Sequence, residues 1–172
     1  GYNANVWRLM KQQGEVETVA IGKRAADRFK NGYASAEKFT GADARELAEK
    51  LCEDFKRKKY ARLGIVSTKY RSMLSQEAVV EWILPLKKSE KKSECPIFEP
   101  DEETVLNNAV VTYVAGCIAA AVKESFASEV AARKVAMDSA GKNAKKMIDE
   151  LSLKYNRARQ GAITQEITEI VA

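Results

Sequence analysis

No proline occurs after Pro100, so the remainder of the chain, from Asp101 to Ala172, contains no residue that obliges a helix to stop. Asp101, Glu102 and Glu103 open this stretch and place negative charge where a helix N-terminus favours it. The pattern predicts one long helix, or two helices joined by a slight break near Gly116 or Ser125–Ser128.

Within this helical region, apolar and small residues recur at alternating steps of three and four, which is the period of a coiled coil. We call this set the seam: Met137, Ala140, Ala144, Met147, Leu151, Tyr155, Ala158 and Ala162. A single helix cannot bury such a stripe, and the first half of the chain offers no helix of comparable length. The seam therefore predicts a helical partner that the chain does not contain. The alternative is that the whole helix folds back on its own domain.

The first half alternates short apolar runs with helical patterns. Three helices are expected: Asn5–Gln13, capped by Asn3 or Asn5 and stopped by Gly14; Lys23–Asn31; and a stronger one from a cap at Asp43 to Lys59, with Ala44, Leu47, Ala48, Leu51 and Phe55 on one face. Strands are expected at Glu17–Ile21, more weakly at Lys38–Thr40, and at Tyr60–Ser67 and Ala78–Leu84.

The spacing of these elements predicts an α/β fold class. Alternating strands and helices favour a small, mostly parallel sheet with helices on both faces, a Rossmann-like arrangement. The segment between the last two strands is too short for a parallel crossover, so these strands should form an antiparallel hairpin at one edge. The predicted organisation is an α/β domain over 1–86, a charged linker over 87–100, and a coiled-coil helical region over 101–172.

Composition narrows the classes of partner. At 45% hydrophobic and 31% charged residues, the chain resembles an ordinary soluble protein. No apolar run approaches the roughly 20 residues of a membrane-spanning helix, and the nearest, Ala109–Val122, is predicted to be a buried helix. The net charge of +5 comes from basic residues interleaved with acidic ones. This pattern favours a solvated surface, with a docking surface for an acidic partner as the alternative, and it disfavours a nucleic-acid partner.

The residues of the chain do not specify an active site. There is no histidine, and the three cysteines, Cys52, Cys95 and Cys117, are odd in number and widely spaced, which predicts free thiols rather than a metal site. The sequence Gly22-Lys23-Arg24 suggests either a weak phosphate site or, preferably, a structural turn. We therefore expect no catalytic, cofactor-binding or metal-binding residues. The chain opens without a secretory signal and without an initiator Met, which suggests a fragment.

The last fifty residues carry a specific series of motifs. Glu129-Val-Ala-Ala-Arg133, Ala136–Ala140 and Met147–Leu151 precede the string Tyr155-Asn-Arg-Ala-Arg-Gln160, which is followed by Ile163-Thr-Gln-Glu166. Upstream, Gly1–Asn5, Ile65–Tyr70, Met73–Gln76, Leu84–Leu86 and Phe98–Pro100 occur in matching order. This series resembles the gamma subunit of the F-type, proton-translocating ATP synthase over essentially the whole chain.

The resemblance has departures. In that family a long N-terminal helix and a first strand precede the Gly-Tyr-Asn turn, so the chain is expected to be a fragment lacking both. The chain also has no paired-cysteine insertion of the plastid kind, which favours a bacterial origin. The expected location is the cytoplasmic face of the bacterial inner membrane, as a peripheral part of the complex, rather than the mitochondrial matrix side.

The resemblance implies a mechanical role without catalysis. The expected function is a central-stalk rotor shaft that couples proton flow through the membrane ring to conformational cycling of the catalytic beta subunits. The implied partners are the alpha and beta subunits, the epsilon subunit and the ring of c subunits, with a second copy of the fragment as a non-physiological partner. Contacts with beta subunits carry over to Arg159, Gln160, Thr164, Gln165 and Glu166.

Two other readings remain as alternatives. A nucleotide-binding enzyme on a doubly wound domain would require a glycine-rich phosphate turn and titratable site residues, and the sequence shows neither. A nucleic-acid-binding coiled-coil protein would require basic residues gathered on one helix face, with strongly salt-dependent binding.

Overall fold

The computed structural model describes residues 2–33, 35–86 and 98–171. It divides into two compact units, Gly1–Ala132 and Arg133–Ala172. The elements are α1 (Tyr2–Gln12), β1 (Ala20–Ile21), α2 (Lys23–Phe29), β2 (Gly32–Tyr33), α3 (Gly41–Lys56), β3 (Leu63–Tyr70), β4 (Gln76–Leu84) and α4 (Glu102–Val171).

The second half of the chain is a single helix, α4, which is continuous over 70 residues. The break considered near Gly116 or Ser125–Ser128 is therefore absent. Asp101 precedes the helix, and its carboxylate accepts hydrogen bonds from the backbone N–H and the hydroxyl of Thr104, both at 2.8 Å. These bonds lower the pKa of Asp101 below its usual value, because they stabilise the ionised carboxylate.

Helix α3 begins at a capping box, in which two residues satisfy each other's backbone N–H groups. The Thr40 hydroxyl accepts from the Asp43 N–H at 3.3 Å, and the Asp43 carboxylate accepts from the Thr40 N–H at 2.7 Å. The predicted cap at Asp43 is wrong by three residues, because Asp43 is the second partner of the box rather than the cap itself. The helix ends at Lys56 instead of Lys59, and Lys58 has a left-handed backbone (φ 57°).

The hairpin expected near the end of the α/β region is confirmed. Strands β3 and β4 pair antiparallel, with Ser67 opposite Val79 and Thr68 opposite Ala78. Strands β1 and β2 pair parallel, and each is two residues long. The α/β class with a long C-terminal helix holds, but the described strands form two separate two-stranded sheets rather than the single sheet predicted. One reason is that side chains of α4 already bond the outer edge of β3 at Thr68 and Tyr70.

The N-terminal elements differ from the expected boundaries. Helix α1 starts at Tyr2, so the two predicted caps, Asn3 and Asn5, lie inside it. The strand expected over Glu17–Ile21 is only two residues long, Ala20–Ile21. Helix α2 ends at Phe29, two residues before the expected end at Asn31, because Lys30 has a left-handed backbone (φ 53°). The weak strand at 38–40 is not formed, since Thr40 serves as the α3 cap.

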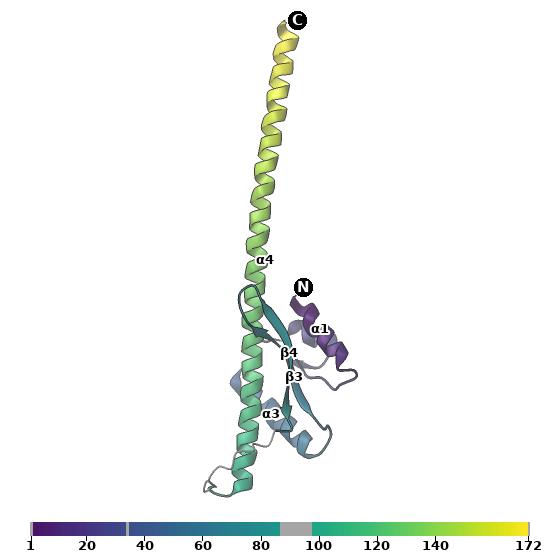
Figure 1. Cartoon of the computed structure of the whole chain (residues 1–172), viewed down its shortest axis with the longest axis vertical. Helices are drawn as coiled ribbons and strands as arrows, with labels where there is room; N and C mark the ends of the chain where they lie inside the picture. Colours follow the sequence, from purple (N-terminus) through teal and green to yellow (C-terminus); the bar gives the residue numbers. More distant parts are fainter. Residues whose placement is uncertain (1, 34, 87–97, 172) are drawn as a thin grey trace. The chain divides into compact units, whose positions relative to one another are not determined.

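The core of the first unit lies where α3, β4 and the beginning of α4 meet. Ala44 and Ala48 of α3, Ile83 of β4, and Val114 and Ile118 of α4 are buried there. The helical face predicted for α3 is the face that packs into this core, with Cys52 as a further buried member and Leu51 and Phe55 at its border. Helix α1 packs on the hairpin (Figure 1).

Helix α4 also contains a window that is long and apolar enough to cross a membrane, judged by length and composition alone. Its mean hydropathy is 1.7 and 17% of it is buried. The expectation that no segment reaches this threshold is therefore wrong for α4. The segment 109–122 is only partly buried, although Val114 and Ile118 within it belong to the core. Most of the predicted linker at 87–100 lies outside the described residues, so the predicted domain boundaries stay predictions.

The pairing of β1 with β2 depends on Gly32. Its backbone has φ 122°, and a Cβ at this position would overlap the Ala20 carbonyl oxygen. We expect Gly32→Ala to destabilise the chain by about 3 kcal/mol, because a left-handed strain is added to a backbone clash. Gly141→Ala is the matched control, since nothing lies within 4 Å of a Cβ there. Urea unfolding measures the free energy of unfolding of both variants. Equal values for the two would contradict the dependence of the β1–β2 pairing on Gly32.

Candidate partner-binding helix surface

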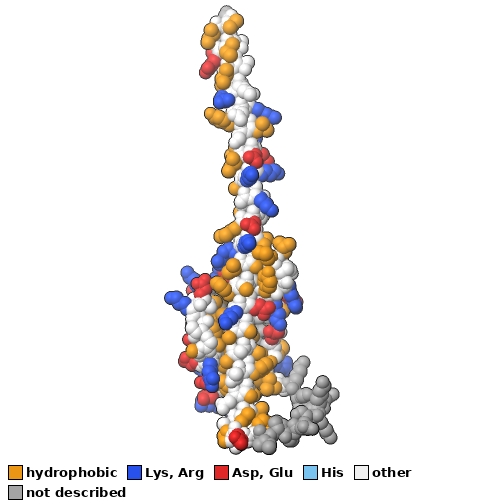
Figure 2. All heavy atoms as spheres, turned by 90° about the vertical axis from the view of Figure 1, so that its left-hand side faces the viewer, with side chains coloured by type: hydrophobic (Ala, Val, Ile, Leu, Met, Phe, Trp, Pro, Cys, Tyr) orange, Lys and Arg blue, Asp and Glu red, His pale blue; other side chains and the backbone are white. Residues whose placement is uncertain are grey.

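The part of α4 in the second unit exposes its apolar side chains. Every described residue from Ala136 to Val171 is exposed. Leu151 is 64% exposed and Tyr155 is 67% exposed, values typical of a side chain in solvent rather than in a core. Figure 2 shows hydrophobic and charged side chains adjacent to one another on this helix. The seam residues therefore lie on an open surface.

The seam residues share one side of the helix. Each residue of an α-helix is rotated by about 100° from the one before it, so the eight seam positions fall within an arc of about 80°. Ile148 borders the same arc and is 62% exposed. The assignment of this arc to a helical partner stays a prediction, which its geometry allows.

The seam combines a run of large residues with runs of small ones on either side of it. Met147, Leu151 and Tyr155 provide large side chains, whereas Ala144 and Ala158 provide small ones. Small residues bury little area but allow two helix backbones to approach closely, and large residues then fit opposite small ones. A partner helix must therefore match this order of sizes, which makes the surface selective in register as well as apolar.

The five residues predicted to contact beta subunits do not share one face. Arg159 and Glu166 are seven residues apart and lie on the same side, next to the seam. Gln160 and Thr164 form a second pair on another side, where the Thr164 hydroxyl donates to the Gln160 carbonyl at 2.8 Å. Gln165 lies apart from both pairs, and its amide donates to Glu169 at 3.0 Å. The helix thus presents these residues around its circumference instead of gathering them into one site.

Arg159 is one of several basic residues near the end of α4 that form no ion pair within the described part of the chain. Among the residues that the structure describes, no carboxylate lies within ion-pair distance of Arg159, whereas Lys146 approaches Glu150 at 4.0 Å. Basic residues outnumber acidic ones between Arg133 and Arg159. A guanidinium without a partner suits bidentate pairing with an incoming carboxylate.

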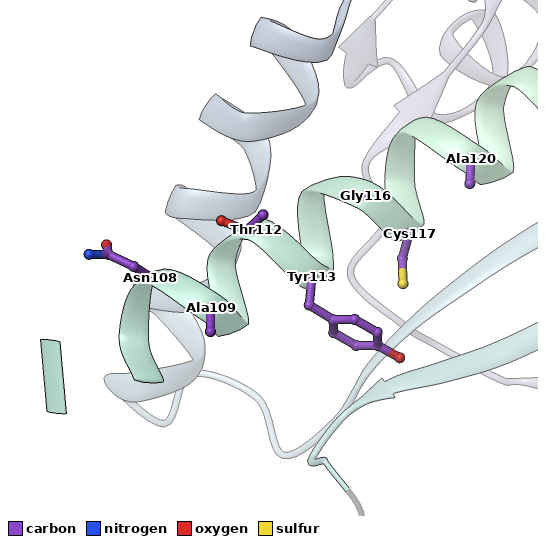
Figure 3. Close-up of a pocket in the computed structure, with 7 residues that line it drawn as sticks. All are labelled: Asn108, Ala109, Thr112, Tyr113, Gly116, Cys117 and Ala120. Atoms are coloured by element: carbon purple, nitrogen blue, oxygen red, sulfur yellow. The ribbon is translucent and has the colours of Figure 1, made fainter. Parts of the chain in front are cut away.

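A second exposed face lies on α4 in the first unit, and the sequence analysis did not single it out. A shallow hollow runs along Asn108, Ala109, Thr112, Tyr113, Gly116, Cys117 and Ala120 (Figure 3). This face is roughly opposite the buried Val114 and Ile118 on the helix. Tyr113 and Cys117 lie one turn apart on it, and a hydrogen bond with Cys117 raises the pKa of Tyr113. The signal available in the sequence was the absence of any charge between Glu103 and Lys123.

The weak phosphate signal at Gly22-Lys23-Arg24 corresponds to a turn. The Gly22 N–H donates to the Tyr33 carbonyl at 2.8 Å, and its carbonyl accepts from Ala26 at 2.8 Å. Both backbone groups of Gly22 are thus used to hold α2 against β2. Cys52 and Cys117 are free thiols, while Cys95 lies outside the described residues. No group of three metal-ligating side chains occurs in the described ranges.

Comparison with known proteins gives a consistent result. The family model described as ATP synthase matches residues 1–172. The ATP synthase gamma chain of Ruminococcus albus is 39% identical over 189 residues, which cover 99% of this chain and 66% of that relative. The ATP synthase gamma chain of Mycoplasmopsis pulmonis is 35% identical over 186 residues, covering 99% of this chain and 67% of the relative. The chain therefore spans about two thirds of the length of these relatives.

A solved structure shares the fold. The rotor of the Euglena gracilis mitochondrial ATP synthase matches with a TM-score of 0.61 at 19% identity, over 94% of this chain and 68% of that chain. This likeness concerns the fold alone. The family model spans the whole chain and the relatives exceed one third identity, so the chain belongs to the ATP synthase gamma-chain family.

Proposed function

We propose that this chain is the central-stalk subunit of an F-type ATP synthase, the rotor shaft that couples proton flow to ATP synthesis. The observation that carries the proposal is the exposed seam on a single continuous helix, in a chain of the gamma family. A stripe of this length favours association with a second long helix. We infer that this partner is another helix of the gamma subunit, which together with α4 forms an asymmetric shaft.

The proposed mechanism needs no chemistry from the chain itself. Catalytic beta subunits hold the nucleotides, and the shaft presents a different face to each of them as it turns. A conformational equilibrium shifts only when a ligand binds one state more tightly than another. The uneven distribution of charged, apolar and small residues around α4 supplies such differences in contact. The role proposed for the chain is therefore non-catalytic.

The first unit has a separate role in this proposal. Its α/β fold is proposed to bind the epsilon subunit and to dock the shaft on the ring of c subunits. Alpha and beta subunits surround the helix of the second unit. The complex is proposed to lie at the cytoplasmic face of a bacterial inner membrane, with this chain as a peripheral component. No observation on the described residues favours the alternative of a nucleotide-binding enzyme.

Within this function, we assign Arg159 to contact with acidic side chains of beta subunits. Its exposure and its lack of a described ion-pair partner support the assignment. Gln160, Thr164, Gln165 and Glu166 are proposed as neighbouring polar contacts. Because they surround the helix, different members would meet different beta subunits at one time.

The assembled enzyme provides the test. Arg159→Ala should reduce proton-driven ATP synthesis by roughly fivefold, which corresponds to about 1 kcal/mol of lost contact free energy. Arg157→Ala is the matched control, because Arg157 lies on nearly the opposite side of the helix. Urea unfolding of the chain alone should be the same for both variants, since both side chains are exposed. Unchanged ATP synthesis by the Arg159→Ala enzyme would refute the assignment.

A further inference from the structure

The outer edge of β3 is bonded to α4 through side chains rather than through another strand. Thr68 stands opposite Ala78 of β4, yet its backbone N–H and C=O point away from that strand, toward α4. In an antiparallel pair, alternate residues direct both backbone groups to the outer edge, and those groups need other partners. Here three side chains of one helix turn supply the partners.

The bonds form a compact set within the first unit. Thr68 N–H donates to the Ser125 hydroxyl at 3.1 Å, and the Ser128 hydroxyl donates to the Thr68 carbonyl at 3.4 Å. Tyr70 N–H donates to the Glu124 carboxylate at 3.2 Å. We call Glu124, Ser125, Ser128 and the two strand residues the β3–α4 clamp. All three helix residues use side chains, so the clamp leaves the backbone hydrogen bonds of α4 unchanged.

The centre of the clamp is dry. Ser128 is 0% exposed and Thr68 is 4% exposed, so water does not compete for their bonds. Tyr2 of α1 closes one side, where its hydroxyl donates to the Ser125 carbonyl at 2.8 Å. Burial raises the pKa of Tyr2 above its usual value. A buried polar group left without a partner is costly, so the Thr68 carbonyl gains from the Ser128 hydroxyl even though that bond, at 3.4 Å, is long.

The spacing of the clamp fixes the register of helix and strand. Four residues of an α-helix rise about 6 Å, and two residues of a strand rise about 6.6 Å, so positions 124–128 match positions 68–70. The buried Val114 and Ile118 also oppose rotation of the helix, because turning it would expose them, but apolar contacts have no preferred bond direction. Hydrogen bonds are directional and break when the helix slides or rotates by a fraction of a turn.

We propose that the β3–α4 clamp is the junction that transmits torque between the α/β unit and the shaft helix. The proposal rests on the proposed function. It names the residues that would carry the torque from the α/β unit to the helix. Ser125, Ser128 and Glu124 act as positioning residues, because they contact no nucleotide and act only by holding the strand edge to the helix. Without them, the core would still hold the buried face of the helix, but no directional bond would fix the edge of β3 to it.

Amide hydrogen exchange tests the clamp itself. In Ser125→Ala, exchange at the Thr68 amide should become about tenfold faster, because its acceptor is lost. The amides of Ser67 and Lys69 point to β4 and should keep their protection. Glu124→Ala should speed exchange at Tyr70 alone, and Ser125→Thr, which keeps the hydroxyl acceptor, should leave exchange at Thr68 slow. Unchanged exchange at Thr68 in Ser125→Ala would overturn the clamp.

The function of the clamp is tested in an assembled ATP synthase whose gamma subunit carries this sequence. Ser125→Ala combined with Ser128→Ala should lower the rate of ATP synthesis at a fixed proton gradient by about fivefold. ATP hydrolysis by the same enzyme should continue. Ser139→Ala, on an exposed part of the same helix, is the matched control. Normal coupling in Ser125→Thr, which keeps the hydroxyl that Ser125→Ala removes, separates positioning from a general loss of stability.

The outcomes separate the two proposals. If the unmodified sequence does not support ATP synthesis in the assembly, the proposed function fails and the torque junction fails with it. If the unmodified sequence supports synthesis but the double variant couples as well as Ser139→Ala, the torque junction alone is overturned. Lower coupling with faster exchange at Thr68 supports both.

Discussion

A helix cannot bury an apolar stripe against itself, and this constraint governs the rest of the structure. In the first part of helix α4, Val114 and Ile118 are buried in a core shared with α3 and β4, which meets this constraint. Beyond Arg133 no other element of the second unit is available, and the described side chains from Ala136 onward are exposed. The same continuous helix is therefore a core element in one unit and an unpaired surface in the other.

The α/β unit depends on polar contacts as much as on its small core. Its two sheets are each two-stranded, and an isolated hairpin is marginally stable in water. The hairpin is stabilised by α1 on one side and by α4 through the β3–α4 clamp. In the proposed rotor shaft, this directional attachment acts together with the apolar core to hold the helix at a fixed angle to the edge of β3.

The long helix, the hairpin, the buried face of α3 and the family could be predicted, because each depends on one strong pattern in the sequence. The absence of proline after Pro100 and the three–four period indicated the long helix and its seam, and the short segment between β3 and β4 indicated an antiparallel hairpin. The α3 face could be predicted because Ala44, Leu47 and Ala48 recur at helical spacing. Family-specific motifs at 155–166 indicated the gamma family, which the comparisons confirm.

The remainder depends on contacts between residues distant in sequence. Strands β1 and β2 are two residues long, too short for a periodic signal, so their bounds could not be predicted. The cap of α3 was expected at Asp43 instead of Thr40, since both are good cap residues and only the three-dimensional geometry distinguishes them. Ser125 and Ser128 carry no local signal, because their partner Thr68 lies 57 to 60 positions away.

The central claim is that the seam needs a helical partner, and its most direct test is the mass of the chain in solution. Light scattering after size exclusion, across a series from micromolar to millimolar chain, should show the mass rising from 19.1 kDa toward twice that value, because a second copy covers the seam when no other helix is present. Leu151→Asp should suppress the rise by placing a charge in the seam. A constant mass of 19.1 kDa at every concentration would contradict the claim.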